Sequence, residues 1–337
     1  MSIKVLLVTI LSLSTITCPS SASLVLVVDL NGGGNFSSVQ SAVDAVPESS
    51  PSKTIIIINS GVYREKVRVS KKKINIVLQG NGYENTFIEW NDTAQSSGKT
   101  SKSYSFGVFA DNFIAHNISF KNTAPEPKPG VIGAQAVAVR IDGDQCAFYG
   151  CGFYGAQDTL FDNAGRQFFK NCFIQGSVDF IYGRGRSLYQ DCTIRSIANE
   201  VTAGISGYIT AQGRASEADQ SGFSFVNCTI DGTGKVLLGR AWRAYAMFSN
   251  TYMSGIIAPD GWSDWRNLTY DKTVTFGEHR CYGEGANYKA RVSYGKQLTD
   301  AEASAFTDIT YIDGDKWLNQ TDILSKVMVE EHLSSSY

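Results

Sequence analysis

The sequence predicts an all-β fold, a parallel β-helix with short capping helices. One short phrase of alternating apolar and polar residues recurs along the chain, with a cysteine in each copy. No helical pattern separates the copies, so strands that recur once per coil can pair in parallel only by stacking. The 337 residues, 43% of them hydrophobic, suffice for one elongated domain or two compact ones, and no linker divides the chain. The copies span residues 148–153, 168–174, 188–194 and 223–230.

The spacing of the cysteines gives the length of a coil. Cys151, Cys172 and Cys192 follow one another at intervals of about twenty residues, and the interval to Cys228 leaves room for a coil with a long loop. We expect these four side chains to point inward and stack as small apolar groups. A disulfide stays open for Cys146 or for neighbours in the ladder. Zinc binding is disfavoured because no paired cysteine and histidine cluster is present.

Capping patterns mark the two ends of the coil array. Ser37 with Gln40 precedes apolar positions and has the capping-box pattern of a short amphipathic helix. Thr299 with Glu302 suggests the same near the other end. Segment 91–105 is rich in Ser, Thr, Gly and Lys, and we expect a loop there.

The N-terminal residues have the layout of a secretory signal. Lys4 precedes the apolar run 5–13, and small residues follow through Ala22. The run is too short to span a bilayer, so we expect residues 1–22 to be removed and residues 23–337 to form one secreted domain without a membrane anchor.

Six Asn-x-Ser/Thr triplets agree with export, because such triplets accept N-linked glycans in secreted proteins. Asn117 and Asn227 fall within strand-like runs, where we expect buried and unmodified side chains. The other triplets begin at Asn35, Asn91, Asn267 and Asn319.

Charge and composition exclude several functions. The 30 basic and 32 acidic residues give a net charge of -2 and a pI near 6.0, so the chain has no electrostatic footprint for nucleic acid. None of the three histidines lies near a Gly-x-Ser-x-Gly elbow, which disfavours a Ser-His-Asp hydrolase. No glycine-rich loop is followed by Gly-Lys-Ser/Thr, so a phosphate-binding loop is absent from the sequence.

Polar residues at predicted strand ends in adjacent coils are the candidates for chemistry. Asp158 and Asp179 are about one coil apart, so stacking would place both carboxylates on one face. Gln157 is beside the first of them, and Gln135 lies about one coil earlier. Two close carboxylates do not both ionise easily, and an arginine such as Arg240 selects the one that keeps its charge. Alone, each aspartate would more often be a turn residue and the arginine a salt-bridge partner.

Five motifs in one order resemble those of plant pectin methylesterases. The resemblance covers nearly the whole mature chain and implies a right-handed β-helix. It implies a carboxylic ester hydrolase that removes methyl esters from homogalacturonan (pectin) in the extracellular cell wall. No metal or organic cofactor is implied; we expect a monomer, and a proteinaceous inhibitor is a candidate partner. The motifs are GVYREKV at 61–67, QAVAVR at 135–140, QDTLF at 157–161, DFIYG at 179–183 and LGRAW at 238–242.

The resemblance also implies a role for each polar residue. Asp179 corresponds to the nucleophile and Asp158 to the general acid and base. Gln157 and Gln135 correspond to oxyanion donors, and Arg240 would hold Asp179 ionised. An ionised carboxylate can attack an ester carbonyl while a protonated neighbour assists departure of methanol.

Two further residues are expected to contact the sugar, and the family pattern is broken at three positions. Trp242 would line the cleft, and Ser105 lies roughly where the family places another substrate contact. Ala156 replaces a common Tyr, Ala241 replaces the usual Pro and Tyr182 replaces Phe. These changes alter the groove wall and spare the catalytic side chains. The chain also resembles the short form of the family, without an N-terminal inhibitor-like pro-region.

Other side chains near the motifs are candidates for substrate contacts. Aromatic rings can stack on sugar rings and arginines can bind free carboxylates, although core packing and a solvated basic face would give the same pattern. These residues are Phe161, Phe180, Trp262, Trp265, Arg184, Arg186, Arg214 and Arg243.

Two other functions compete with the esterase. A catalytically silent wall protein that binds pectin is motivated by Ala156 and Ala241. A pectin lyase or galacturonase is motivated only by the shared architecture, and the calcium-binding carboxylate cluster usual for a lyase is missing from the sequence.

Overall fold

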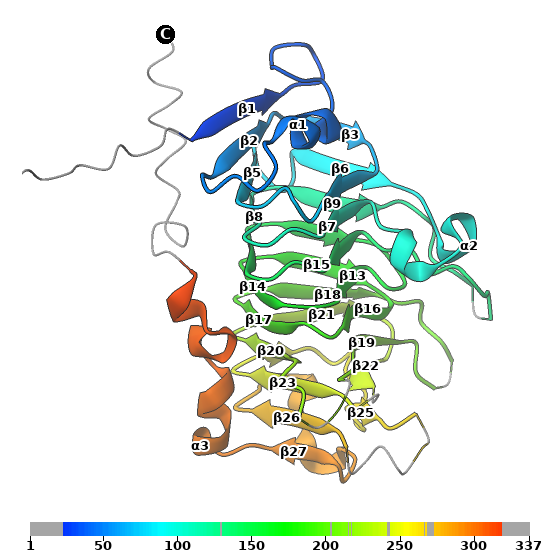
Figure 1. The fold of residues 1–337 in the computed structure, drawn as a ribbon. Coiled ribbons are helices and arrows are strands. Elements are labelled where there is room, and N and C mark those ends of the chain that lie inside the picture. Colours follow the sequence, from blue (N-terminus) through cyan, green and yellow to red (C-terminus); the bar gives the residue numbers. More distant parts are fainter. Residues whose placement is uncertain are drawn as a thin grey trace, which may run out of the picture.

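The computed structural model describes residues 23–318 except 129, 203, 215, 217, 241, 242, 266 and 268–272. In this part the chain passes through three parallel sheets in turn, so the strands of one sheet come from successive coils (Figure 1). The predicted parallel β-helix is confirmed. Residues 1–22, the predicted signal, lie outside the described residues. No helix in the described part is long and apolar enough to cross a membrane.

We name the three sheets A, B and C. Sheet A contains β1 (Leu24–Val28), β2 (Thr54–Ile58), β5 (Ile76–Gly80), β8 (Ile114–His116), β11 (Cys146–Tyr149), β14 (Arg166–Lys170), β17 (Arg186–Gln190), β20 (Gly222–Val226), β23 (Tyr245–Ser249), β26 (Thr275–His279) and β27 (Gly295–Gln297). Sheet B contains β3 (Gly61–Arg64), β6 (Thr86–Trp90), β9 (Ser119–Asn122), β12 (Gly152–Tyr154), β15 (Phe173–Gly176), β18 (Thr193–Ile197), β21 (Thr229–Thr233) and β24 (Tyr252–Met253). Sheet C contains β4 (Val67–Val69), β7 (Phe106–Val108), β10 (Val139–Ile141), β13 (Leu160–Asp162), β16 (Val178–Gly183), β19 (Gly207–Gln212), β22 (Val236–Arg240) and β25 (Trp262–Ser263).

Short helices lie at the ends and in the loops. The α-helices are α1 (Val39–Ala45), α2 (Ala94–Ser97) and α3 (Asp300–Ala303). The 3-10 turns are η1 (Thr100–Lys102), η2 (Glu284–Ala286), η3 (Tyr288–Ala290), η4 (Ser304–Phe306), η5 (Ile309–Ile312) and η6 (Gly314–Lys316).

Aromatic rings from successive coils stack inside sheet A. Phe148, Phe169, Tyr189, Phe225 and Phe248 lie on β11, β14, β17, β20 and β23 and are fully buried. Their neighbouring ring centroids are 4.4–5.0 Å apart and their planes lie within 15° of parallel. Each ring removes a large apolar area from water, and each stacked pair adds about 1 kcal/mol. This column supports the sheets that carry the candidate site.

The four predicted ladder cysteines are buried and free, between sheets A and B. Each Sγ lies 3.4–3.7 Å from a carbonyl oxygen of an earlier coil, as Cys172 does with Phe148. Burial raises the pKa of the Cys172 thiol well above its usual value, so it stays an uncharged, weak donor. Cys146 is also free. Cys281 extends the ladder, with its Sγ 3.3 Å from the Phe248 carbonyl, although the sequence pattern did not indicate it.

A left-handed residue precedes each ladder cysteine and turns the chain from sheet A to sheet B. Asn171 has φ 54° and Asp191 has φ 56°, and Asn117 and Asn227 occupy the same position with φ 53° and 55°. Asparagine, aspartate and glycine tolerate this conformation better than other residues. The prediction that Asn117 and Asn227 are buried is therefore wrong, because both side chains project from turns and are exposed.

The capping predictions are correct in kind and differ in detail. The N-cap of α1 is Ser38 instead of Ser37. Glu65, from the first motif, accepts from the amides of Val39 and Gln40 at 2.8 and 2.9 Å, so its negative charge faces the helix N-terminus.

Two further helix starts carry reciprocal caps. The predicted Thr299–Glu302 capping box is present at α3. A similar box at Thr93 begins α2, so segment 91–105 is partly helical where we expected a loop.

The last described segment runs back along sheet A (Figure 1). Tyr311 and Ile312 of η5 pack against Ala147, Phe168 and Leu188 in a second apolar cluster outside the main core. The C-terminal segment therefore covers part of the outer face of sheet A and leaves sheet C uncovered by these residues.

Candidate active site

The candidate residues converge on sheet C. Asp158 lies just before β13, and its amide donates to the Val178 carbonyl at 3.0 Å, one coil later. Asp179 follows Val178 directly in β16. Arg240 ends β22, two coils after β16 in the sheet order. The structure therefore brings together the two aspartates that the spacing predicted to meet and the arginine that the motifs assigned to them.

Both aspartates have a left-handed backbone. Their φ values are 64° for Asp158 and 50° for Asp179, and the pairing of β16 with β19 shifts register between Val178 and Ile181. An aspartate tolerates this conformation, but it interrupts the regular alternation of a strand. These irregularities aim both carboxylates away from ordinary strand positions and toward each other's coil.

Arg240 forms an ion pair with Asp179. Its Nη2 donates to Oδ2 of Asp179, whose side chain is only 11% exposed. The guanidinium carbon lies 4.6 Å from the ring centroids of both Tyr208 and Trp265. A planar cation between two rings has little freedom to move, so Arg240 is held against the carboxylate.

The two carboxyl groups differ in proton affinity. Burial raises the pKa of Asp158 well above its usual value, the negative charge of Asp179 adds to this, and Arg240 offsets it in part. Burial also raises the pKa of Asp179, but the charge and hydrogen bond of Arg240 lower it. The two groups titrate as a coupled pair. Asp158 therefore takes the shared proton and Asp179 keeps the charge beside Arg240.

The backbones of the two glutamines are fixed in neighbouring coils. The Gln157 carbonyl accepts from the Ala136 amide at 3.0 Å, and Gln157 forms a parallel bridge with Val178. The Gln135 carbonyl accepts from the Ala94 amide at 2.7 Å. Both side chains are half-buried beside the coil that carries Asp158. Amide N–H groups held there are suited to stabilising negative charge on a reacting oxygen.

No metal cluster accompanies these residues in the described part of the chain, where no three His, Cys, Asp or Glu side chains are placed to hold an ion. The charged groups among the candidate residues are two carboxyl groups and one guanidinium. This set can perform nucleophilic attack by a carboxylate with proton transfer from its neighbour.

Comparison with known proteins decides the family. The family model for pectinesterases matches residues 25–315. The chain belongs to the pectinesterase family. Putative pectinesterase 14 of Arabidopsis thaliana is 56% identical over 298 residues, which cover 88% of this chain and 89% of that protein. Probable pectinesterase 8 of the same plant is 52% identical over 303 residues, covering 88% and 77%.

Solved pectin methylesterases share the fold. The enzyme from carrot superposes with a TM-score of 0.81 at 35% identity, covering 87% of this chain and 94% of that one. The enzyme from Aspergillus niger gives a TM-score of 0.75 at 29% identity, covering 90% and 99%. The pectinesterase fold of this chain is thus the right-handed parallel β-helix that the motifs implied.

The two predicted substrate contacts are placed differently. Trp242 lies outside the described residues. Ser105 is fully buried in this pectinesterase, where its Oγ donates to the Lys121 carbonyl at 2.8 Å and its amide donates to the Val137 carbonyl. The structure does not bring Ser105 to the surface of the site, because its hydroxyl bonds to the Lys121 carbonyl of β9 instead.

The neighbouring aromatic residues divide into two groups. Phe161 and Tyr182 stack in register on β13 and β16, with centroids 4.4 Å apart and planes 2° from parallel. Phe180 and Trp262 are buried in the core and face inward. Sequence reasoning missed Tyr208, because nothing in its strand distinguishes an arginine-stacking ring from a common strand tyrosine.

Of the three positions that break the family pattern, Ala241 lies outside the described residues, whereas Ala156 and Tyr182 are described. Ala156 lines a hollow of about 220 Å³, which also touches Gln175 and Lys121. The Tyr182 hydroxyl is buried without a hydrogen-bond partner in the described structure. Burial and the charge of Asp158 raise the pKa of Tyr182, so its hydroxyl stays protonated beside the pair.

Proposed function

We propose that the protein hydrolyses methyl esters of homogalacturonan to give de-esterified pectin and methanol. The observation that carries the proposal is the Asp179–Arg240 ion pair beside Asp158, whose pKa burial raises. Membership of the pectinesterase family supports the same reaction. Acyl transfer from an uncharged ester needs one ionised carboxylate as the nucleophile and one protonated carboxyl as the acid.

In the first step, the Asp179 carboxylate attacks the ester carbonyl. Asp158 gives its proton to the departing methoxy oxygen, so methanol leaves and an anhydride joins Asp179 to the sugar. Charge on the carbonyl oxygen is stabilised by amide donors, and Gln157 and Gln135 are the residues assigned to this.

In the second step, water hydrolyses the anhydride. Asp158, now ionised, takes a proton from the water, and the hydroxide equivalent adds to the sugar carbonyl. Breakdown frees the sugar carboxylic acid, which loses its proton to solvent, and regenerates ionised Asp179 and protonated Asp158. Arg240 favours the charged form of Asp179 at the start and end of the cycle.

The site of action is the cell wall outside the cell. The signal-like residues 1–22 and the Asn-x-Ser/Thr triplets support export. Asn117 and Asn227 are exposed at turns between sheets A and B, where a glycan would be accommodated without entering the core. The substrate would lie along sheet C, past Phe161 and Tyr182.

The test is methanol release from highly methylated pectin by the wild type, Asp179→Asn and Asp158→Asn. We expect the Asp179→Asn variant to lose activity by about 10⁴-fold or more, because an amide cannot serve as the nucleophile. Asp231→Asn is the control, since Asp231 pairs with Arg195 on sheet B at 2.8 Å and away from the site.

The possible products separate the competing functions. Methanol release that survives in Asp179→Asn would refute the assignment of the nucleophile. Pectin binding without methanol release at any pH would indicate a silent binding protein, and unsaturated products or new reducing ends would indicate a lyase or a galacturonase.

A further inference from the structure

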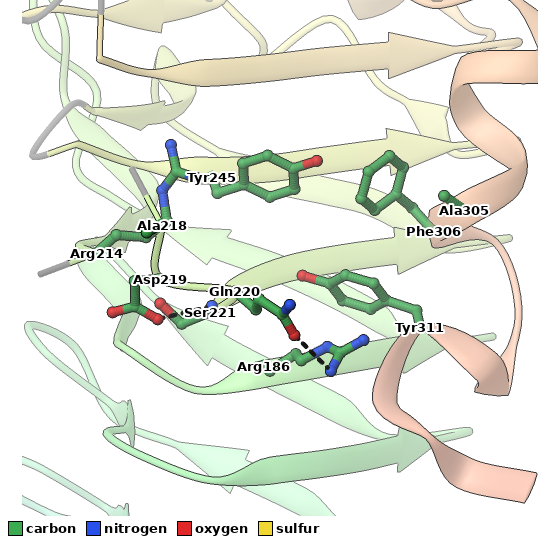
Figure 2. A pocket seen from close by; sticks show the side chains of 10 residues that line it. All are labelled: Arg186, Arg214, Ala218, Asp219, Gln220, Ser221, Tyr245, Ala305, Phe306 and Tyr311. Carbon is green, nitrogen blue, oxygen red and sulfur yellow. Dashed lines mark hydrogen bonds between the residues drawn. The ribbon is translucent and has the colours of Figure 1, made fainter. Parts of the chain in front are cut away.

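A pocket of about 340 Å³ opens on sheet A, whereas the aspartate pair lies on sheet C (Figure 2). Four separate parts of the chain build it. Arg186 and Tyr245 begin β17 and β23, Asp219 and Gln220 come from the loop that follows β19, and Tyr311 belongs to η5. The sequence placed Arg186 and Arg214 among the candidate substrate contacts near the motifs, but the structure puts both at this pocket on sheet A, and the proposed function uses none of these residues.

Two buried donor atoms in this pocket have no hydrogen-bond partner among the described residues. Tyr311 is only 6% exposed, and its hydroxyl has no hydrogen-bond partner in the described structure. Figure 2 shows this hydroxyl pointing into the pocket. The buried Nε of Arg186 is also without a partner among the described residues. An unmade hydrogen bond of a buried donor is costly, so a ligand that supplies oxygen atoms would be stabilised here.

Gly222 keeps the floor of the pocket open. A Cβ at this position would lie 2.7 Å from the Tyr311 hydroxyl oxygen and 2.6 Å from a ring carbon of Tyr245. Any other residue would therefore displace one or both of these rings. The glycine at the start of β20 thus leaves room for the Tyr311 hydroxyl, whose oxygen is itself buried.

Two guanidinium groups give the pocket positive charge. Arg214 lies 4.8 Å from the Tyr245 ring centroid and donates to the Arg243 and Thr273 carbonyls. Arg186 lies 5.4 Å from the Tyr311 ring centroid and contacts the Gln220 side-chain oxygen at 3.4 Å. Both cations are stacked on rings and are thus held in place.

One carboxylate near Arg186 does not cancel this charge. Asp313 lies 3.3 Å from Arg186, but it also contacts Arg166 at 3.3 Å and Lys316 at 3.4 Å. Arg166 is also paired with Asp144 at 2.6 Å, so three cations and two anions lie on this side of the pocket. Asp219 is the remaining acidic group in the lining, and its Oδ1 accepts from the Ser221 amide.

The mixture of groups indicates the class of ligand. An inorganic anion would use only donors and would be repelled by Asp219. A sugar that carries a carboxylate uses all of them, because its hydroxyl groups donate to Asp219 and Gln220 while its carboxylate accepts from arginine. The volume is at the lower end of the range for small-molecule sites and suits one or two sugar rings.

We propose that this pocket is a second, non-catalytic site that binds an acidic sugar residue with a free carboxylate. Galacturonate as that sugar rests on the proposed function, because it is the product of demethylation on sheet C. The site would hold de-esterified polymer on a face of the molecule separate from the aspartate pair. It would discriminate against methylated residues, whose ester carries no charge for Arg186 and Arg214.

The test is equilibrium dialysis of digalacturonate against the whole secreted protein, with Arg186→Gln and Tyr311→Phe. We expect the wild type to bind at two sites per chain, and Arg186→Gln to weaken one of them by about 10-fold or more. Tyr311→Phe removes a hydroxyl that makes no hydrogen bond to the described residues, so the variant should fold and weaken the same site by about 3- to 10-fold. Arg195→Gln removes a charge from sheet B and should retain both sites.

Methanol release should be unchanged in both pocket variants. Equal binding by the wild type, Arg186→Gln and Tyr311→Phe would overturn the proposal, and so would equally strong binding of dimethylated digalacturonate at the second site. Inorganic phosphate that displaces digalacturonate from it with equal strength would indicate a simple anion site and also contradict it. Two binding sites without methanol release would refute only the proposed function, whereas methanol release with one binding site would refute only the second site.

Discussion

A left-handed backbone conformation occurs both in the turns between sheets A and B and at the start of strands in sheet C, but its role differs between the two regions. At the first, Asn171 is left-handed, and its side chain is exposed to solvent. At the second, Asp158 and Asp179 are also left-handed, but Asp179 is only 8% exposed. The first turn recurs in coil after coil and serves only to bend the chain. The second occurs in two adjacent coils and presents carboxylates to each other.

The difference shows how a repeat can acquire a chemical site. A residue type selected for a turn, aspartate or asparagine, already carries a polar side chain. When the turn is buried and a cation such as Arg240 faces it, the same residue has a perturbed pKa. Variants that affect one turn and spare the other can therefore separate chemistry from folding.

Among variants that leave both aspartates in place, Arg240→Gln, which removes the cation, should have the largest effect. Arg240 lowers the pKa of Asp179, so its loss raises that pKa. Because the nucleophile must be ionised, the acidic limb of the pH–rate profile should move to higher pH, and kcat/KM should fall by about 100-fold or more. Methanol release measured across pH checks this. A profile that keeps its acidic limb, as expected for the control Arg195→Gln, would contradict the role of Arg240.

The next effect concerns a buried carboxyl outside the pair. Burial raises the pKa of Asp162 to about 7, against 3.8 for a free side chain. Between these values the folded state holds a proton that the unfolded state has lost, so stability should fall as the pH rises from about 4 to about 7. Asp162→Asn should remove this slope in urea unfolding at several pH values. An unchanged slope would mean that other groups cause it.

Two tyrosines test how much a buried hydroxyl contributes to the free energy of unfolding with and without a hydrogen-bond partner. The Tyr189 hydroxyl donates to Asp162 at 2.8 Å, whereas the Tyr182 hydroxyl has no partner in the described structure. Tyr189→Phe should lower the free energy of unfolding by about 1–3 kcal/mol, and Tyr182→Phe should leave it equal or higher. Chemical denaturation compares them. Equal losses in the two variants would mean that the Tyr182 hydroxyl has a partner after all.

The smallest effect is expected at the structural turn. Asn171→Ala should destabilise the protein by about 1 kcal/mol, because alanine tolerates a left-handed backbone poorly, while Asn171→Gly should have a smaller effect. Thermal unfolding measures the difference, and methanol release should stay at the wild-type level in both. A loss of activity in Asn171→Gly would show that the two kinds of turn are coupled.

Much of the fold was predictable because each coil repeats the same pattern of buried, polar and turn residues. The cysteine phrase revealed the period, and the period alone was enough to assign Asp158 and Asp179 to adjacent coils. Cys281 escaped notice because Arg280 precedes it, where most other copies have asparagine or aspartate before the cysteine. Asn117 and Asn227 were misplaced because a strand-like run does not reveal where the chain turns.

The charged residues of the site were predictable from the sequence, whereas the residues that surround them were less so. Family motifs identified Arg240, but the rings of Tyr208 and Trp265 that hold it come together only through the register of sheet C. Ser105 matched a family position by a loose alignment, and burial gives it a structural hydrogen bond instead. The pocket on sheet A joins segments far apart in the sequence, so no local pattern could indicate it.

The central claim is that Asp158 carries the proton while Asp179 is charged beside Arg240. Carbon-13 NMR of labelled aspartate carboxyl groups, with Asp158→Asn to assign the resonance, measures it directly. We expect the Asp158 carboxyl to remain protonated at pH values well above the usual aspartate pKa of about 4, where Asp179 is already ionised. An Asp158 resonance that titrates at the usual value, or Asp179 protonated before Asp158 as the pH falls, would contradict it.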